Sequence, residues 1–387
     1  MPMPTSHAAS HPSGPSRPHV CYFLFCSNKY GTERMAIATL EALRDEFDVS
    51  VISPPGEIQQ WTSERAIPHQ TFGSLREVAM MIWRLLGRHD RVGFISTTVK
   101  ASFLFAALNL LRRRETIHLH VVHGSGSDSA FQHKHWLNHL PIAVLAVSGW
   151  VREQLIHHGV KPSKVIVAPN FISTSRAAEL PFTPPRATAS RAIVIGRLDA
   201  SKRVDLLLDA MEQMPELRSL PVDVYGGGPL LEDYRKRAAQ GQLPVTFHGF
   251  CDDVVQRLPQ ADLFIHTSSV EAAALVILEA MAVGVPVLLP DRGGVKEFIE
   301  PGVSGLIYKA DDARALGEGI LAARSLSAAR RAQIAAAARR RVDEVYSQAA
   351  AGGLYRQLLT GLIRPAGADC SPRRDAIESL PSPARSH

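Results

Sequence analysis

The sequence is poor in cysteine: its 387 residues include four, Cys21, Cys26, Cys251 and Cys370. Cys21 and Cys26 lie five positions apart on one expected strand, so we expect their side chains on opposite faces. None of the spacings is typical of a zinc site. Few and scattered cysteines exclude a disulfide-stapled scaffold and favour a reducing compartment, the cytoplasm.

Long apolar runs are also absent. No stretch of about 18 consecutive apolar residues occurs, so we expect no membrane-spanning helix. Residues 1–18 are rich in Pro, Ser and His and have no apolar centre, which argues against a signal peptide and for a disordered arm. Residues 365–387 predict a disordered tail for the same reason.

The sequence lacks the motifs of several protein classes. No Asp-x-Asp triplet is present to hold a metal-bound diphosphate, so we expect neither a metal ion nor a cofactor. Leu231 stands where the dinucleotide fingerprint has its last glycine, which argues against a dehydrogenase. The net charge of +6 and the pI of about 9.2 suit anionic small molecules or an anionic membrane surface. Without an RNA- or DNA-binding motif, we expect no nucleic-acid partner.

What the sequence does contain is a regular alternation of apolar strands and amphipathic helices from residue 19 onward. This pattern is typical of parallel sheets covered on both faces. It stops at 173–190, a stretch rich in Pro, Ser, Thr and Ala, and then restarts. We expect an α/β protein of two tandem Rossmann-like, doubly wound domains, 19–172 and 191–364, joined by a linker at 173–190. The natural ligand site is the cleft between them, at the carboxyl ends of the strands.

Two segments at such strand ends favour phosphate binding. Arg197 and Lys202 follow the expected strand 191–196, and two cations there suit a phosphate group. Gly226, Gly227 and Gly228 separate a strand from a helix, where glycines let a ligand approach the backbone. Each segment also has a simpler interpretation, a solvated loop for the first and a tight turn for the second.

Two glutamates lie in the unusually apolar stretch 268–290. A helix is expected to begin near Ala273 or Ala274, just after Glu271, and its first N–H groups are free to bind an anion. Glu279 lies in that helix, so that both carboxylates can face one cleft and accept hydrogen bonds from sugar hydroxyls. The alternative is a structural pair. We expect ligand to hold both carboxylates, and water to solvate them without it.

These segments resemble the family-4 retaining glycosyltransferases of GT-B fold. The likeness runs through IVIGRLDASKR, VYGGGPL, VTFHGFCDD, the stretch from ADLFIHTSSVE to GGVKEFI, and GVSGLIY, in the family's order over about 191–320. The N-terminal half resembles the family more loosely, through YGTERMAIATLEAL, VVHG and AVSGWVREQL.

The resemblance implies a role for each matching residue. Arg197 and Lys202 would hold the donor diphosphate, Glu279 the ribose and Glu271 the transferred sugar. The distal phosphate and sugar would lie against backbone at Gly226, Gly228, Ala274, Leu275, Val276 and Gly31. His123, at the end of its strand, would face the reacting centre; His118 and His120 are the competing histidines, and their mid-strand positions favour packing instead.

Three positions depart from the family pattern. Ala272, Ala273 and Ala274 replace its Gly-Phe-Gly, Arg203 replaces a common glycine, and PNFIS (169–173) replaces Pro-Asn-Gly-hydrophobic-Asp. Alanine keeps the backbone N–H groups, but each added Cβ narrows the pocket. The choice of donor is therefore open.

The resemblance implies an enzyme that transfers a sugar, with retention, from a nucleotide diphosphate sugar to a hydroxyl of a sugar or lipid-linked acceptor. Surface polysaccharide or glycolipid synthesis would be its setting. The alternatives are a sugar-nucleotide epimerase or phosphorylase on the same fold, and a degenerate binder without catalysis.

Two helical segments, 78–88 and 101–114, combine an apolar face with basic ends. Such segments can lie on an anionic membrane, which would place the enzyme peripherally on the inner face of the cytoplasmic membrane. The alternative, which the pattern favours, is that they are outer helices of the first domain packed on its sheet.

Overall fold

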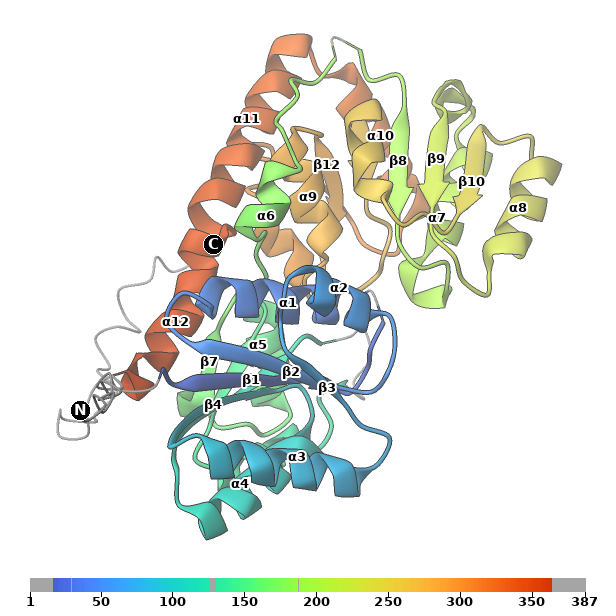
Figure 1. Cartoon of the computed structure of the whole chain (residues 1–387). Helices are drawn as coiled ribbons and strands as arrows, with labels where there is room; N and C mark the ends of the chain where they lie inside the picture. Colours follow the sequence, from blue (N-terminus) through green and yellow to red (C-terminus); the bar gives the residue numbers. More distant parts are fainter. Residues whose placement is uncertain (1–16, 29, 125–129, 187, 364–387) are drawn as a thin grey trace, which may run out of the picture.

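The computed structural model describes residues 17–28, 30–124, 130–186 and 188–363 (Figure 1). The expected arm at 1–18, apart from its last two residues, and the expected tail at 365–387 lie outside these ranges. Two α/β domains with parallel sheets are present, which confirms the predicted fold class. No helix in these ranges is both long and apolar enough to cross a membrane.

The N-terminal domain has a seven-stranded parallel sheet of order β3-β2-β1-β4-β5-β6-β7. Its strands are β1 (His19–Phe23), β2 (Asp48–Ser53), β3 (His69–Thr71), β4 (Arg91–Ser96), β5 (Glu115–Val122), β6 (Ala143–Ala146) and β7 (Val165–Val167). Its helices are α1 (Gly31–Leu43), α2 (Ile58–Glu64), α3 (Leu75–Arg88), α4 (Val99–Arg112) and α5 (Gly149–His157).

Side chains of β1 alternate between two cores, as the period of a strand requires. Val20 and Tyr22 belong to the core with α1 and α5, while Cys21 and Phe23 belong to the core with α3 and α4. The sheet is therefore covered on both faces (Figure 1). Cys26, expected on the same strand as Cys21, instead lies beyond the end of β1 and is exposed.

The C-terminal domain has a six-stranded parallel sheet of order β10-β9-β8-β11-β12-β13. Its strands are β8 (Ala192–Ile195), β9 (Val222–Tyr225), β10 (Val245–Gly249), β11 (Leu263–Ile265), β12 (Val287–Pro290) and β13 (Leu306–Tyr308). Its helices are α7 (Val204–Gln213), α8 (Leu231–Gln240), α9 (Leu275–Val283), α10 (Ala313–Ser325) and α11 (Ala328–Val345). The strand order reverses between β8 and β11, and a ligand crevice is expected beyond the ends of those two strands.

The chain crosses between the domains twice. The first crossing contains a short helix, α6 (Thr174–Ala178), inside the stretch expected to be a linker. After α11 the chain returns to the N-terminal domain as α12 (Gly353–Leu359). There Tyr355, Leu359 and Leu362 join the core that contains β1 and α1. Arg91 Nη1 donates to the carbonyl of Leu362 at 2.8 Å and fixes the end of this segment.

The domains also meet through a carboxylate. Glu297, in a 3₁₀ turn at Gly294–Phe298, accepts hydrogen bonds from the backbone N–H groups of Gly149 (2.8 Å) and Trp150 (2.7 Å). These are the first two residues of α5, and Ser148 caps the third N–H from within the N-terminal domain. A carboxylate of the C-terminal domain thus accepts the hydrogen bonds of the free N–H groups at a helix N-terminus of the N-terminal domain.

Candidate active site

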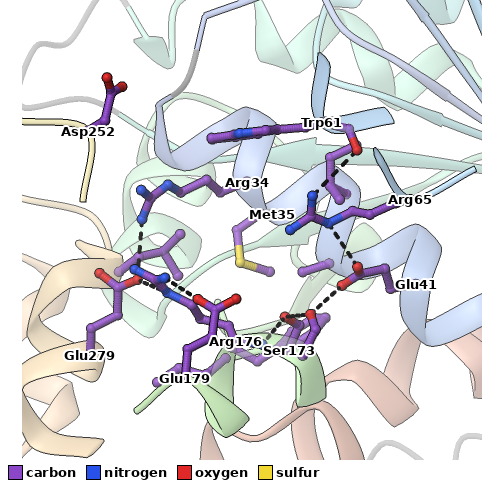
Figure 2. A pocket seen from close by; sticks show the side chains of 16 residues that line it. Arg34, Met35, Glu41, Trp61, Arg65, Ser173, Arg176, Glu179, Asp252 and Glu279 are labelled. Atoms are coloured by element: carbon purple, nitrogen blue, oxygen red, sulfur yellow. Dashed lines mark hydrogen bonds and ion pairs between the residues drawn. The ribbon is translucent and has the colours of Figure 1, made fainter. Parts of the chain in front are cut away.

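An open pocket lies between the two domains and has a volume of about 860 Å³, including space open to solvent (Figure 2). It is lined by α1 and α2 on one side and by α6 and α9 on the other. Its charged and aromatic side chains are Arg34, Glu41, Trp61, Arg65, Phe171, Arg176, Glu179, Asp252 and Glu279. Of the site residues predicted from the sequence, Leu275 and Glu279 line this pocket, whereas Arg197, Lys202 and Glu271 do not.

Glu279, on the second turn of α9, is only 4% exposed. Its Oε1 accepts hydrogen bonds from Arg34 Nη1 of α1 at 3.2 Å and from Arg176 Nε of α6 at 2.9 Å (Figure 2). The other oxygen, Oε2, makes no hydrogen bond within the described part of the chain. Burial of this carboxylate is therefore offset by two arginines, and the expectation that water alone would solvate it is wrong.

Glu271 lies in the loop between β11 and α9 and forms an ion pair with Lys202, in the loop after β8. Burial alone would raise the pKa of Glu271, but Lys202, His266 and the N–H of Ala272 outweigh it and hold the pKa below its usual range. The expectation of solvation by water is wrong here too, because a protein cation is the partner. The pair spans β8 and β11, the two strands at which the order of the sheet reverses.

The helix α9 begins one or two residues later than predicted, at Leu275, with Ala274 as its N-cap. No side chain caps it, and the N–H of Ile277 donates to the carbonyl of Ala274 at 3.2 Å. The N–H groups of Leu275 and Val276 make no hydrogen bond among the described residues and can bind an anion. The preceding alanines contact the other domain. Asn170 Nδ2 donates to the carbonyl of Ala273 at 2.9 Å, and Ala272 is buried.

The glycine run after β9 has a backbone explanation. Gly226 has φ of +144°, and a Cβ there would lie 1.9 Å from the carbonyl oxygen of Gly196. Gly228 has φ of +158°, and a Cβ there would lie 2.3 Å from the carbonyl oxygen of Leu198. Both glycines are needed because the loops after β8 and β9 touch. Their roles in substrate binding stay predictions.

Arg197 lies in the first of these loops. Its side chain is 57% exposed, and its Nε is 3.3 Å from Asp199 Oδ2. Lys202, in contrast, is half-buried and already paired with Glu271. The two predicted phosphate ligands therefore differ in their surroundings: Arg197 is in contact with solvent, and Lys202 is paired with a carboxylate.

On the other side of the cleft, Gly31 opens α1, and a Cβ there would meet no atom within 4 Å. His123 follows β5, and its buried Nε2 has no hydrogen-bond partner among the described residues. Burial, and then the charge of Lys134, lower the pKa of His123 to about 4. A Cβ on the next residue, Gly124, would lie 3.0 Å from the Cβ of Ala272, so this loop meets the loop between β11 and α9 that carries Glu271.

The competing histidines are packed inside the N-terminal domain. His120 Nδ1 lies 2.9 Å from Ser102 Oγ, and His118 Nε2 lies 3.2 Å from the same hydroxyl. Burial lowers the pKa of both histidines, so they are neutral. Their mid-strand positions had indicated this packing.

Sequence reasoning missed the residues that hold Glu279. Arg34 follows Gly31 by one helical turn, and its guanidinium lies 5.7 Å from the ring centroid of Trp61. Arg176 is in the presumed linker and also pairs with Glu179 at 2.5 Å. The periodicity of α1 places Arg34 on the face of Gly31, but no pattern in the sequence pointed to Arg176.

Within the described ranges, no group of three or more His, Cys, Asp or Glu side chains could hold a metal ion. Arg34 and Arg176 line the pocket, and Lys202 pairs with Glu271 in the loop before α9. Such an arrangement can bind a diphosphate and stabilise negative charge that develops on it.

Solved structures with the same architecture are glycosyltransferases. The structure of HepE from Anabaena, in complex with UDP and glucose, has a TM-score of 0.73 at 21% identity, covering 89% of this chain and 100% of that chain. At this identity the likeness concerns the fold alone, and it defines the class: two facing Rossmann-like domains of the GT-B type.

Family models cover both halves of the chain. The model for Glycosyltransferase Family 4 matches residues 30–176, and that for Glycosyl transferases group 1 matches residues 177–341. The chain therefore belongs to family 4 of the GT-B glycosyltransferases, as its sequence segments predicted.

Two curated relatives indicate the range of the family. D-inositol 3-phosphate glycosyltransferase of Geodermatophilus obscurus is 34% identical over 254 residues, 56% of this chain and 55% of the relative. The putative colanic acid biosynthesis glycosyltransferase WcaL of Escherichia coli is 28% identical over 216 residues, 53% of each. The chain spans about half the length of these relatives.

Proposed function

We propose that this protein transfers a sugar from a nucleotide diphosphate sugar to an acceptor hydroxyl with retention of configuration and without a metal ion. One observation carries the proposal: Glu279 is buried at the cleft, its Oε1 is held by two arginines, and its Oε2 has no hydrogen-bond partner among the described residues. A fixed, ionised acceptor with one oxygen to spare suits a ribose hydroxyl. HepE, which binds UDP and glucose, supports a nucleotide-sugar donor.

In this mechanism Arg197, Lys202 and the first turn of α9 at Ala274, Leu275 and Val276 bind the donor diphosphate. They stabilise the charge that develops as the bond from the anomeric carbon to the diphosphate breaks. The acceptor oxygen attacks from the face that the diphosphate leaves, and its proton passes to the departing phosphate oxygen. Glu271 binds the transferred sugar, and no side chain forms a covalent bond. His123 and Gly31 close the site from the other domain.

The acceptor and its location belong to the same proposal. Helices α3 and α4 bury Val78, Ile82 and Phe105 against the sheet, as the packing interpretation required. Their outer side also exposes large apolar side chains, Met80, Trp83, Leu110 and Leu111. The Arg112 guanidinium lies 3.6 Å from the ring centroid of Trp83. We infer a peripheral contact with an anionic membrane on the cytoplasmic side, where a lipid-linked acceptor would be available for surface polysaccharide synthesis. Colanic acid biosynthesis is the process in the name of WcaL.

Donor binding is tested by thermal shift with UDP, GDP, ADP and their sugars. A nucleotide at 100 times its Kd should stabilise the protein by about 2.7 kcal/mol. Lys202→Ala and Arg197→Ala should each weaken donor binding or turnover by about 1.5–3 kcal/mol, because each removes a charged hydrogen bond. Normal turnover by both variants would refute the phosphate assignment.

Products separate the alternatives. Transfer with retention, unchanged in EDTA, is expected by NMR of the product's anomeric proton. Release of an epimerised sugar nucleotide would indicate an epimerase, and donor binding with neither transfer nor hydrolysis would indicate a degenerate binder. Cosedimentation with anionic vesicles at low and high salt tests the membrane contact, and absence of binding at low salt would favour a soluble acceptor.

A further inference from the structure

A second cavity lies in the N-terminal domain, beyond the carboxyl ends of β1, β4 and β5. Its polar lining includes Glu33, Thr97, Thr98, His123 and Lys134. It adjoins the donor side, because Gly124, which also lines it, meets Ala272 just after Glu271. By this position it is the acceptor's side of the cleft in the proposed reaction.

His120, on strand β5, holds the side chain of Lys134 in this cavity. Its Nζ is 3.1 Å from His120 Nε2, while His120 Nδ1 is 2.9 Å from Ser102 Oγ, itself 2.6 Å from Ser96 Oγ. Because an ammonium only donates, His120 must accept at Nε2 and carry its proton on Nδ1. The packed histidine and serines thus position Lys134 and use one of its three N–H groups.

Among the residues that the structure describes, Lys134 has no ion-pair partner. No carboxylate of the described residues lies within ion-pair distance of Nζ, and its contact with His120 is the one hydrogen bond of this ammonium within them. Burial lowers the pKa of Lys134 to about 8, so the group is still mostly protonated at neutral pH. An ammonium that is half-buried and lacks an anion is unfavourable, which makes the cavity suited to bind an anion.

Two neighbouring atoms also lack partners. His123 Nε2 and Glu33 Oε2 are both buried and make no hydrogen bond within the described ranges. Glu33 Oε2 can accept from a hydroxyl group. The cavity therefore offers a cation for an anionic group and an acceptor for a hydroxyl, close to the donor-side loop.

We propose that this cavity binds an acidic acceptor, whose carboxylate or phosphate group is held by Lys134 while its hydroxyl groups face Glu33 and His123. This rests on the proposed glycosyl transfer and names the chemical class of its acceptor. A neutral sugar would leave the Lys134 charge unpaired, so the site discriminates against it.

The test measures binding of three probes by ligand-observed NMR: methyl glucuronide, glucose 6-phosphate and methyl glucoside. A saturating nucleotide diphosphate fills the donor phosphate site in each sample. The natural protein should bind one or both anionic probes at least tenfold more tightly than methyl glucoside, and the better of the two distinguishes a carboxylate from a phosphate acceptor. Lys134→Met should abolish the difference, Lys134→Arg should retain part of it, and Lys161→Met, an exposed lysine of the same domain, should leave it unchanged.

Equal binding of charged and neutral probes, or a Lys134→Met variant that still prefers the anionic probe, would overturn the proposal. Melting temperatures of the variants exclude misfolding as the cause. Stabilisation by the nucleotide diphosphate is recorded on the same samples. If the nucleotide still stabilises the Lys134→Met variant, the variant has lost acceptor recognition and not the donor site. If the nucleotide does not stabilise the natural protein either, the proposed donor site itself is wrong.

Discussion

Glu279 carries a charge in a nearly closed position because two arginines share one of its oxygens. Glu279→Gln should weaken nucleotide diphosphate binding by about 1.5–3 kcal/mol, since a charged acceptor becomes a neutral amide and Arg34 and Arg176 lose their counter-charge. Isothermal titration measures this. A variant that binds nucleotide normally but melts at a lower temperature would make Glu279 a purely structural residue.

Glu271 and Lys202 give a prediction about pH. The pKa of Glu271 is lowered in the folded protein, so its ionised pair stabilises the fold above the usual carboxyl pKa. That contribution is lost as the pH falls below the ordinary carboxyl pKa of 4.5 toward the lower pKa of Glu271 in the folded protein. The natural protein should therefore be more stable than Glu271→Gln at pH 7, and the two should converge in acid. Urea titrations at pH 7, 5 and 3 check this, and a difference that does not depend on pH would contradict it.

The same residue change separates binding from turnover. Glu271→Gln should leave affinity for the free nucleotide diphosphate nearly unchanged and lower the rate of sugar transfer, because the proposed partner of Glu271 is the sugar. Titration and turnover on one preparation supply both values. Equal losses in the two measurements would place Glu271 on the nucleotide instead.

At the residue scale the sequence singled out Glu271, its partner Lys202 and Glu279, but not the arginines that hold Glu279. The spacing of Glu271 and Glu279 marked both carboxylates. Arg34 and Arg176 lie 245 and 103 residues from Glu279, so only the folded chain brings them to it. Local patterns do not report contacts of such separation.

At the scale of elements, α6 links the first crossing to the donor site through Arg176. Arg176→Ala should raise the Kd for nucleotide diphosphate about fivefold to tenfold, because Glu279 would lose one of its two positioning donors. Thr174→Ala, on the same short helix, is the matched control and should bind normally. Partial recovery of nucleotide affinity by Arg176→Lys would support a positioning role through charge. If Arg176→Ala and Thr174→Ala instead lower the melting temperature equally and leave nucleotide affinity unchanged, the effect is loss of the helix.

Most elements were predictable because strands buried on both faces are continuous apolar runs. β2 (Asp48–Ser53) has the sequence DVSVIS and α7 (Val204–Gln213) the sequence VDLLLDAMEQ, and their apolar residues predict a strand and a helix. β3, three residues of mostly exposed edge strand, gave no such run, and α2 was missed as well. α6 was hidden because Ser, Thr and Ala are as common in linkers as in helix starts.

At the scale of the whole molecule, Glu297 ties the C-terminal domain to the N-terminus of α5. Glu297→Ala should expose two unsatisfied N–H groups, cost about 1–2 kcal/mol and loosen the contact between the domains. Small-angle scattering without nucleotide should then give a larger radius of gyration. Glu153→Ala, an exposed carboxylate on α5, is the control and should not change it.

The return of α12 has a consequence for how the chain can be divided. Tyr355, Leu359 and Leu362 are buried in the core of the N-terminal domain, although they follow α11 of the other domain. A chain cut between Pro184 and Pro185 therefore yields two fragments that share one core, since the second carries α12 back to the first. Co-expressed, the two pieces should copurify as a working heterodimer. Omitting 353–363 from the second piece should abolish their association, so that this protein can serve as a split reporter whose reassembly is driven by a single helix.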